Sequence, residues 1–107
     1  MPFKSDAHYY VTRGVNDSIQ DRYIRCIIDI INLDRQNNVK ADYLKVFHFS
    51  NHPEKDNIIQ IKESQEVPSF KQTLEITGHL EKSFKVWVIS DEGTDVENVT
   101  ILFPEEY

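Results

Sequence analysis

The chain has 107 residues, of which 39% are hydrophobic and 28% charged, and its formal net charge is −6. This length suits one domain, which we expect to span residues 1–107, and folding at this size buries roughly 65% of the unfolded surface. The net charge falls entirely after residue 90, because the 12 acidic and 12 basic residues before that point balance. With no basic excess, the composition argues against a nucleic-acid-binding protein, which needs clustered Lys and Arg to neutralise phosphates.

Cysteine content and hydropathy bear on the compartment. Cys26 is the only cysteine in the sequence, so no internal disulfide can form. The first ten residues lack the apolar segment of a signal peptide, and the longest apolar runs are far shorter than a membrane span. We therefore expect a soluble cytoplasmic protein with no membrane partner.

The first predicted element is a strand over residues 8–13 (HYYVTR). It leads through Arg13 and Gly14 into a helix, a geometry shared with many phosphate-binding sites. Here the turn contains one glycine and no lysine, and the Asp17 carboxylate already satisfies free N–H groups at the start of the helix. We therefore interpret Gly14 as a residue that supplies an unusual backbone angle at a turn.

The second predicted element is a helix that begins at an Asp17 cap and ends near Gln36. Gln20 follows the cap by three residues, as in a capping box, and Asn16 and Ser18 are alternative caps. At 100° per residue the apolar side chains form one broad face, which we expect to lie flat on a sheet and to be held by packing. That face consists of Ile19, Tyr23, Cys26, Ile27, Ile30, Ile31 and Leu33.

The rest of the chain is predicted to form five strands. Residues 70–77 alternate cleanly between apolar and polar side chains, and residues 84–90 are apolar on both faces, which is typical of a central strand. Strands joined by short links pair antiparallel. The fold class is therefore α+β, with one amphipathic helix on a mainly antiparallel sheet of five to six strands in the order β-α-β-β-β-β-β. The five strands cover residues 42–50, 57–63, 70–77, 84–90 and 99–103.

The sequence contains no pattern that indicates a metal, a cofactor or a catalytic centre. The histidines at positions 8, 48, 52 and 79 are scattered, whereas a structural zinc site needs four converging ligands. Cys26 lies on the apolar helix face and is expected to be an inert core residue. The acidic segment 91–98 lacks the residue order of a calcium loop, so we interpret it and the C-terminal tail as solvated. The G-x-S-x-G and S-x-x-K patterns of nucleophilic enzymes are absent, while pairing of carboxylates in space is not readable from a sequence.

Five segments together resemble a family of small uncharacterised proteins of staphylococci and other Firmicutes, known as domain of unknown function 960. The segments occur in the family's order and span nearly the whole chain. The resemblance implies a single-domain bacterial cytosolic protein and implies no activity, so no catalytic residue is carried over. The segments are YYVTRGV (9–15), DYLKVF (42–47), QEVPSFK (65–71), KVWVISD (85–91) and LFPEEY (102–107).

We expect a small non-enzymatic interaction module, because an open sheet has edges that can pair with a protein partner or with a second copy of the chain. One alternative is a small-ligand binder or enzyme with a pocket between helix and sheet near Arg13. A second alternative is an acidic mimic of nucleic acid that blocks a basic protein. Whether Arg13 is structural or functional stays open. The candidate interaction residues are Arg13, Tyr9, Tyr10, Trp87, Asp91 and Glu92.

Overall fold

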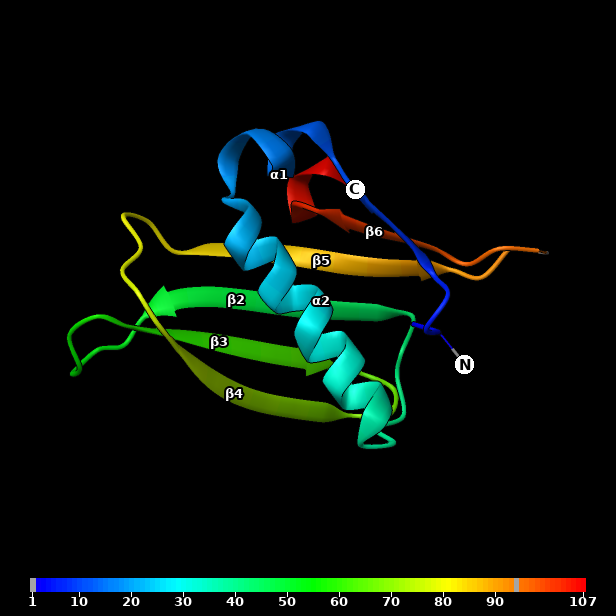
Figure 1. Cartoon of the computed structure of the whole chain (residues 1–107), viewed down its shortest axis with the longest axis horizontal. Coiled ribbons are helices and arrows are strands. Elements are labelled where there is room, and N and C mark those ends of the chain that lie inside the picture. Colours follow the sequence, from blue (N-terminus) through cyan, green and yellow to red (C-terminus); the bar gives the residue numbers. More distant parts are fainter. Residues whose placement is uncertain (1, 94) are drawn as a thin grey trace.

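The computed structural model describes residues 2–93 and 95–107 and shows one main helix lying across one face of a six-stranded sheet (Figure 1). The strands lie in the order β1-β6-β5-β2-β3-β4, with β1 parallel to β6 and every other pairing antiparallel. The predicted α+β class and the order of strands around the main helix are confirmed. The strands are β1 (His8–Val11), β2 (Leu44–Asn51), β3 (Ile58–Gln65), β4 (Phe70–Thr77), β5 (Phe84–Asp91) and β6 (Asn98–Leu102).

Strand bounds follow the hydrophobic alternation of the sequence closely. The predicted strand at residues 70–77 matches β4 residue for residue, and the others differ by one or two residues at their ends. β5 lies inside the sheet between β6 and β2, as its two apolar faces indicated. The alternation succeeds here because one face of each strand is turned toward the hydrophobic core.

Residues 13–36 form two α-helices where the sequence predicted one. Helix α1 (Arg13–Ser18) and helix α2 (Asp21–Gln36) are separated by two extended residues, so the prediction of a single helix capped at Asp17 was wrong. Thr12 caps α1, accepting a hydrogen bond at Oγ1 from the N–H of Val15 (3.3 Å). Because the fully buried Val15 anchors this first turn, the chain is already helical where the sequence suggested a loop.

The core fills the space between α2 and the sheet. Tyr23 of α2 packs edge-on against Phe49 of β2, and Phe49 stacks on Phe84 with ring centroids 4.6 Å apart. The buried helix face differs from the prediction at its end, because Leu33 is 47% exposed and Asp34 only 5%. Asp34 follows the buried Ile27, Ile30 and Ile31 at helical spacings of seven, four and three residues, so it lies on their face.

The opposite face of the sheet carries alternate residues of the same strands and is not covered by α2 (Figure 1). Trp87 lies on this outer face, half-buried beside Tyr107 with ring centroids 5.6 Å apart. A short 3₁₀ helix, η1 (Pro104–Glu106), leads to Tyr107. Within the described residues, no helix is long and apolar enough to cross a membrane.

Candidate functional site

Polar side chains from α2, β2, β3 and β4 meet at one end of the helix–sheet interface. On β2 the row of Phe49 and Phe47 continues to Lys45, and on β3 the row of Ile59 and Ile61 continues to Glu63. The side chains of Lys45 and Glu63 are 1% and 0% exposed. Gln72 of β4 and Asp34 of α2 complete the group, which we call the buried polar cluster and which consists of Asp34, Lys45, Glu63, Gln65 and Gln72.

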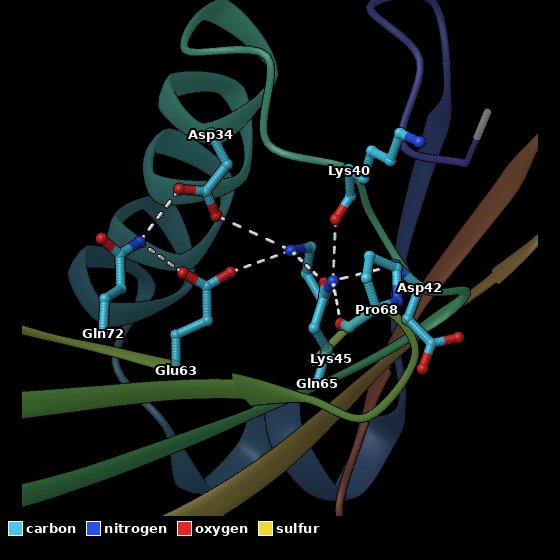
Figure 2. A network of polar contacts seen from close by, with 8 residues as sticks. All are labelled: Asp34, Lys40, Asp42, Lys45, Glu63, Gln65, Pro68 and Gln72. Atoms are coloured by element: carbon cyan, nitrogen blue, oxygen red, sulfur yellow. Dashed lines mark hydrogen bonds and ion pairs between the residues drawn. The ribbon is translucent and has the colours of Figure 1, made fainter. Parts of the chain in front are cut away.

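The cluster is a connected network of charges and amides (Figure 2). Lys45 Nζ donates to Glu63 Oε2 and to Gln65 Oε1, both at 3.0 Å, and lies 3.7 Å from Asp34 Oδ2. Gln72 Nε2 donates to Asp34 Oδ1 (2.9 Å) and to Glu63 Oε1 (2.5 Å), so one amide holds two carboxyl groups side by side. A lone ion in such a place is strongly disfavoured, whereas a paired and hydrogen-bonded set persists.

Glu63 is the titratable centre of the cluster. Burial raises the pKa of Glu63 to about 7; the neighbouring Asp34 adds to the rise, while Gln72 and Lys45 oppose it. Near neutral pH the Glu63 carboxyl therefore exchanges a proton within a buried setting. This is the carboxyl pairing that the sequence could not display.

Gln65 connects the cluster to the loops around it. Its Nε2 donates to the carbonyls of Lys40 (2.7 Å) and Pro68 (2.9 Å), and its Oε1 accepts from the N–H of Asp42 (3.2 Å) as well as from Lys45. The link after α2 and the turn after β3 are thus tied to the same buried amide. Such bonds satisfy loop backbone groups that would otherwise be buried without partners.

A hollow of about 380 Å³ opens beside the cluster, between the end of α2, the link 39–41 and the N-terminal segment. Asp34 and Lys45 line its inner part, and Phe3 and Ile31 contribute apolar walls. Its volume falls within the range of small-molecule pockets, roughly 300–1,000 Å³. The cluster therefore borders a space that can admit a ligand.

Glu97 holds the N-terminal segment in place beside the hollow through hydrogen bonds. Its carboxylate accepts hydrogen bonds from the N–H groups of Phe3 and Lys4 and from the hydroxyl of Ser90. Burial alone would raise the pKa of Glu97, but these bonds, with the charge of Lys4, hold it below its usual value. The Phe3 ring lies 5.6 Å from Lys45 Nζ. The prediction that the whole acidic segment is solvated was thus wrong at Glu97, which is 4% exposed.

Arg13 points into solvent, away from the interface between α2 and the sheet. Its side chain is 95% exposed and lies 3.8 Å from Asp17 in a surface ion pair. Its neighbour Gly14 is helical, which corrects the expectation of an unusual backbone angle. A Cβ on Gly14 would lie 2.6 Å from Glu106 Oε2, and Glu106 Oε1 accepts from Thr12 Oγ1 (2.7 Å). The strand-to-helix turn therefore holds the chain's own carboxylate, and glycine leaves room for it.

The other sequence candidates do not converge on one site. Tyr9 is half-buried on the helix-covered face; its hydroxyl has no hydrogen-bond partner among the described residues, and its pKa is raised mainly by burial. Tyr10 is 52% exposed on the outer face, which it shares with Trp87. Asp91 and Glu92 lie where β5 ends, and Glu92 pairs with Lys4 (3.4 Å).

β4 leaves one edge of the sheet unpaired within the described chain. The N–H of Gly78 donates to the Asn57 carbonyl (2.8 Å), which defines a hydrogen-bonded pair of the β3–β4 ladder. Because such pairs alternate, the even-numbered residues of β4 bond to β3 and the odd-numbered residues direct their N–H and C=O groups outward. In agreement, the Thr77 carbonyl accepts from Arg22 Nη2 (2.8 Å) instead of from β3. Lys71, Thr73 and Glu75 form the remaining free edge.

The fold and its site define a small α+β protein in which one helix covers one face of an open-edged sheet over a buried polar cluster. The chain belongs to DUF960, the family described as a staphylococcal protein of unknown function, whose model matches residues 8–106. It is also similar to the crystal structure of a protein of unknown function from Enterococcus faecalis, with a TM-score of 0.76 and 25% sequence identity over 100% of this chain and 96% of that one. None of the curated proteins matches the chain significantly. The comparisons confirm the expected family and indicate no specific function.

Proposed function

We propose that the protein is a small cytoplasmic interaction module that pairs with a second copy of itself through the free edge of β4. The observation that carries the proposal is this edge, which belongs to an eight-residue strand and pairs with no other strand of the described chain. A free edge of this length is a template for adding another strand. The identity of the added strand follows from the side chains along the edge.

An antiparallel pairing centred on Thr73 matches opposite charges. It places Lys71 opposite Glu75 of the second copy, and two-fold symmetry repeats the pair. All three residues direct backbone groups outward, so each opposed pair can form two hydrogen bonds. Centring the axis on Lys71 or on Glu75 instead would place like charges opposite each other. Glu75 also lies 3.5 Å from His52 and 3.8 Å from Lys55 in its own chain, and the second copy adds a further cation.

The same register matches apolar side chains on the helix-covered face. Phe70 falls opposite Ile76 of the second copy, again twice by symmetry. Both side chains are only partly buried in the single chain, and pairing removes more of their apolar surface from water. The edge thus offers backbone, charge and apolar complementarity in one register.

Sedimentation velocity over about a hundredfold range of concentration tests the proposal, since association follows mass action. The wild-type protein is expected to shift from monomer to dimer as concentration rises. Lys71→Glu, which places two acids opposite each other at both ends of the pair, is expected to weaken the dimer about tenfold. The double variant Lys71→Glu/Glu75→Lys restores opposite charges and is expected to recover it.

Lys85→Glu is the matched control, because Lys85 is an exposed lysine on β5, inside the sheet. This change leaves the β4 edge intact and is expected to keep the dimer. A protein that stays monomeric at every concentration contradicts the proposal. So does a dimer that responds equally to Lys71→Glu and Lys85→Glu.

A further inference from the structure

We propose that the hollow beside the buried polar cluster binds a small organic anion with an apolar body and a hydroxyl group, the hydroxyl lying between Asp34 and Lys45. The site lies under α2, apart from the β4 edge, so its test is independent of self-pairing. The inference starts from two polar atoms whose hydrogen-bonding capacity is unused.

Asp34 Oδ2 is a buried oxygen that accepts no hydrogen bond from the described residues, although Asp34 is only 5% exposed. Lys45 Nζ has three N–H donors and uses two of them, on Glu63 and Gln65. Among the described residues, the further polar atom recorded beside Lys45 Nζ is Asp34 Oδ2 at 3.7 Å, which is beyond hydrogen-bond length. A buried acceptor and a buried donor thus face each other across a gap at the wall of the hollow.

A hydroxyl group satisfies both atoms at once. Its oxygen can lie about 2.8 Å from each, accepting from Lys45 Nζ while its own proton is donated to Asp34 Oδ2. An apolar group would leave both atoms without partners, which is unfavourable in a buried site. A carboxylate would accept from Lys45 but repel Asp34. The cluster therefore selects a group that is both donor and acceptor.

The mouth of the hollow is cationic. Lys4, Arg35 and Lys40 all line it. Lys4 pairs with Glu92, and Arg35 donates to the Asn32 side chain (2.7 Å), but no carboxylate among the described residues pairs with Arg35 or Lys40. Unpaired cations at the rim favour an anionic group at the outer end of a ligand.

The walls between the two ends are apolar. Phe3, Ile31, Val39 and Ala41 also line the hollow, and these side chains suit a ring or a short hydrocarbon chain. The ligand is thus described from the inside outward as hydroxyl, apolar body and anionic group. 4-Hydroxyphenylacetate has this composition and serves as the probe. Phenylacetate lacks the hydroxyl, and 4-hydroxyphenylethanol lacks the charge.

Titration of the ¹⁵N-labelled protein with each compound, up to about 10 mM, measures binding by amide chemical shifts. 4-Hydroxyphenylacetate is expected to shift amides of residues 3–4, 31–41 and 45. Phenylacetate is expected to bind about tenfold more weakly, since a hydrogen bond to a charged group is lost. 4-Hydroxyphenylethanol is expected to bind more weakly as well, since it makes no contact with the cationic mouth.

Two variants test which residues contact the hydroxyl end and the anionic end of the ligand. Asp34→Asn replaces the free acceptor with a donor and is expected to weaken 4-hydroxyphenylacetate at least about tenfold. Lys40→Gln, at the surface where the fold is not at risk, is expected to weaken both acids and leave 4-hydroxyphenylethanol unchanged. Lys62→Gln on the exposed side of β3 is the matched control and is expected to change nothing.

Each other outcome overturns the proposal. Shifts that are absent at the highest concentration, or confined to other parts of the sheet, show that the hollow does not take this class of ligand. Equal binding of 4-hydroxyphenylacetate and phenylacetate shows that the gap between Asp34 and Lys45 recognises no hydroxyl and holds a water molecule only. An equal loss of affinity for 4-hydroxyphenylacetate in Lys40→Gln and Lys62→Gln shows that the mouth makes no specific contact with the ligand.

Discussion

Lys45 of β2 and Glu63 of β3 form an ion pair, Nζ to Oε2 3.0 Å, with both side chains inside the helix–sheet interface. Each is next to buried apolar residues on the helix-facing row of its strand, and each is joined to Asp34 of α2 through the cluster. The pair therefore links the helix to two central strands. Because each charge stabilises the other, removing one charge is expected to lower the free energy of unfolding more than removing both.

Lys45→Met tests this dependence. The change leaves Glu63 and Asp34 adjacent without their cation, and a buried ion stripped of its partner typically costs about 3–5 kcal/mol of unfolding free energy. The double variant Lys45→Met/Glu63→Gln removes one of the stranded acids and is expected to recover part of that loss. Urea denaturation at pH 7.5 measures both. A double variant less stable than Lys45→Met would contradict the account.

Glu63 predicts a pH dependence of stability. Its pKa of about 7 in the folded protein exceeds the ordinary value near 4.3, so between these pH values the folded state binds more protons than the unfolded state. The stabilisation is complete below about pH 4 and is lost as pH rises through 7, a change on the order of 3 kcal/mol.

Glu63→Gln removes this titration and is expected to flatten the stability curve between pH 5 and 7.5, measured by urea denaturation. Glu66→Gln, an exposed position in the turn after β3, is the matched control and keeps the wild-type slope. Parallel curves for the wild-type protein and Glu63→Gln would show that Glu63 titrates normally.

The contact between Gly14 and Glu106 predicts that Gly14→Ala changes stability in opposite directions depending on whether Glu106 is present. In the wild-type protein Gly14→Ala forces its Cβ onto the Glu106 carboxylate and is expected to destabilise by about 1 kcal/mol. In a Glu106→Ala background the space is open, and alanine in α1 is expected to stabilise by about 0.5–1 kcal/mol because of its higher helix propensity. Thermal denaturation of the four proteins completes a double-mutant cycle. Equal effects of Gly14→Ala in both backgrounds would rule out this contact.

Glu97 predicts acid release of the N-terminal segment. Its pKa lies below the ordinary value near 4.3, so the stabilisation is present above that value and is lost as pH falls through the folded pKa. Amide exchange at Phe3 and Lys4, corrected for intrinsic rates, is expected to accelerate at pH 3 relative to pH 6. Glu97→Gln is expected to exchange fast at both values. Protection of these amides that is unchanged at pH 3 would contradict the role of Glu97.

Much of the fold could be predicted from the sequence because the strands and the main helix have clear periodic patterns of apolar residues. β4 was predicted residue for residue from alternation, whereas the break between α1 and α2 was missed because Asp17 resembled a cap and the burial of Val15 depends on tertiary packing. The prediction of the buried helix face was wrong at its end, where Leu33 is exposed and Asp34 is buried.

The buried polar cluster was missed for a related reason. Its members continue apolar rows, Lys45 after Phe47 and Glu63 after Ile61, and a charge at such a position reads as the solvated end of a strand. A signal was present, since Asp34, Lys45 and Glu63 each follow buried apolar residues near the ends of the helix-facing rows of α2, β2 and β3. That these ends meet depends on strand register, which periodicity does not determine.

The most direct measurement of the proposed self-pairing is a disulfide at its centre. In a Cys26→Ser background, Thr73→Cys places two cysteines opposite each other across the proposed two-fold axis, about 5.5 Å apart between Cα atoms, within the range that a disulfide bridges. Thr77→Cys, on the same edge but away from the axis, is the control. The account predicts that mild oxidation converts Thr73→Cys to covalent dimer and leaves Thr77→Cys monomeric. Equal cross-linking of the two variants, or none in either, would contradict it.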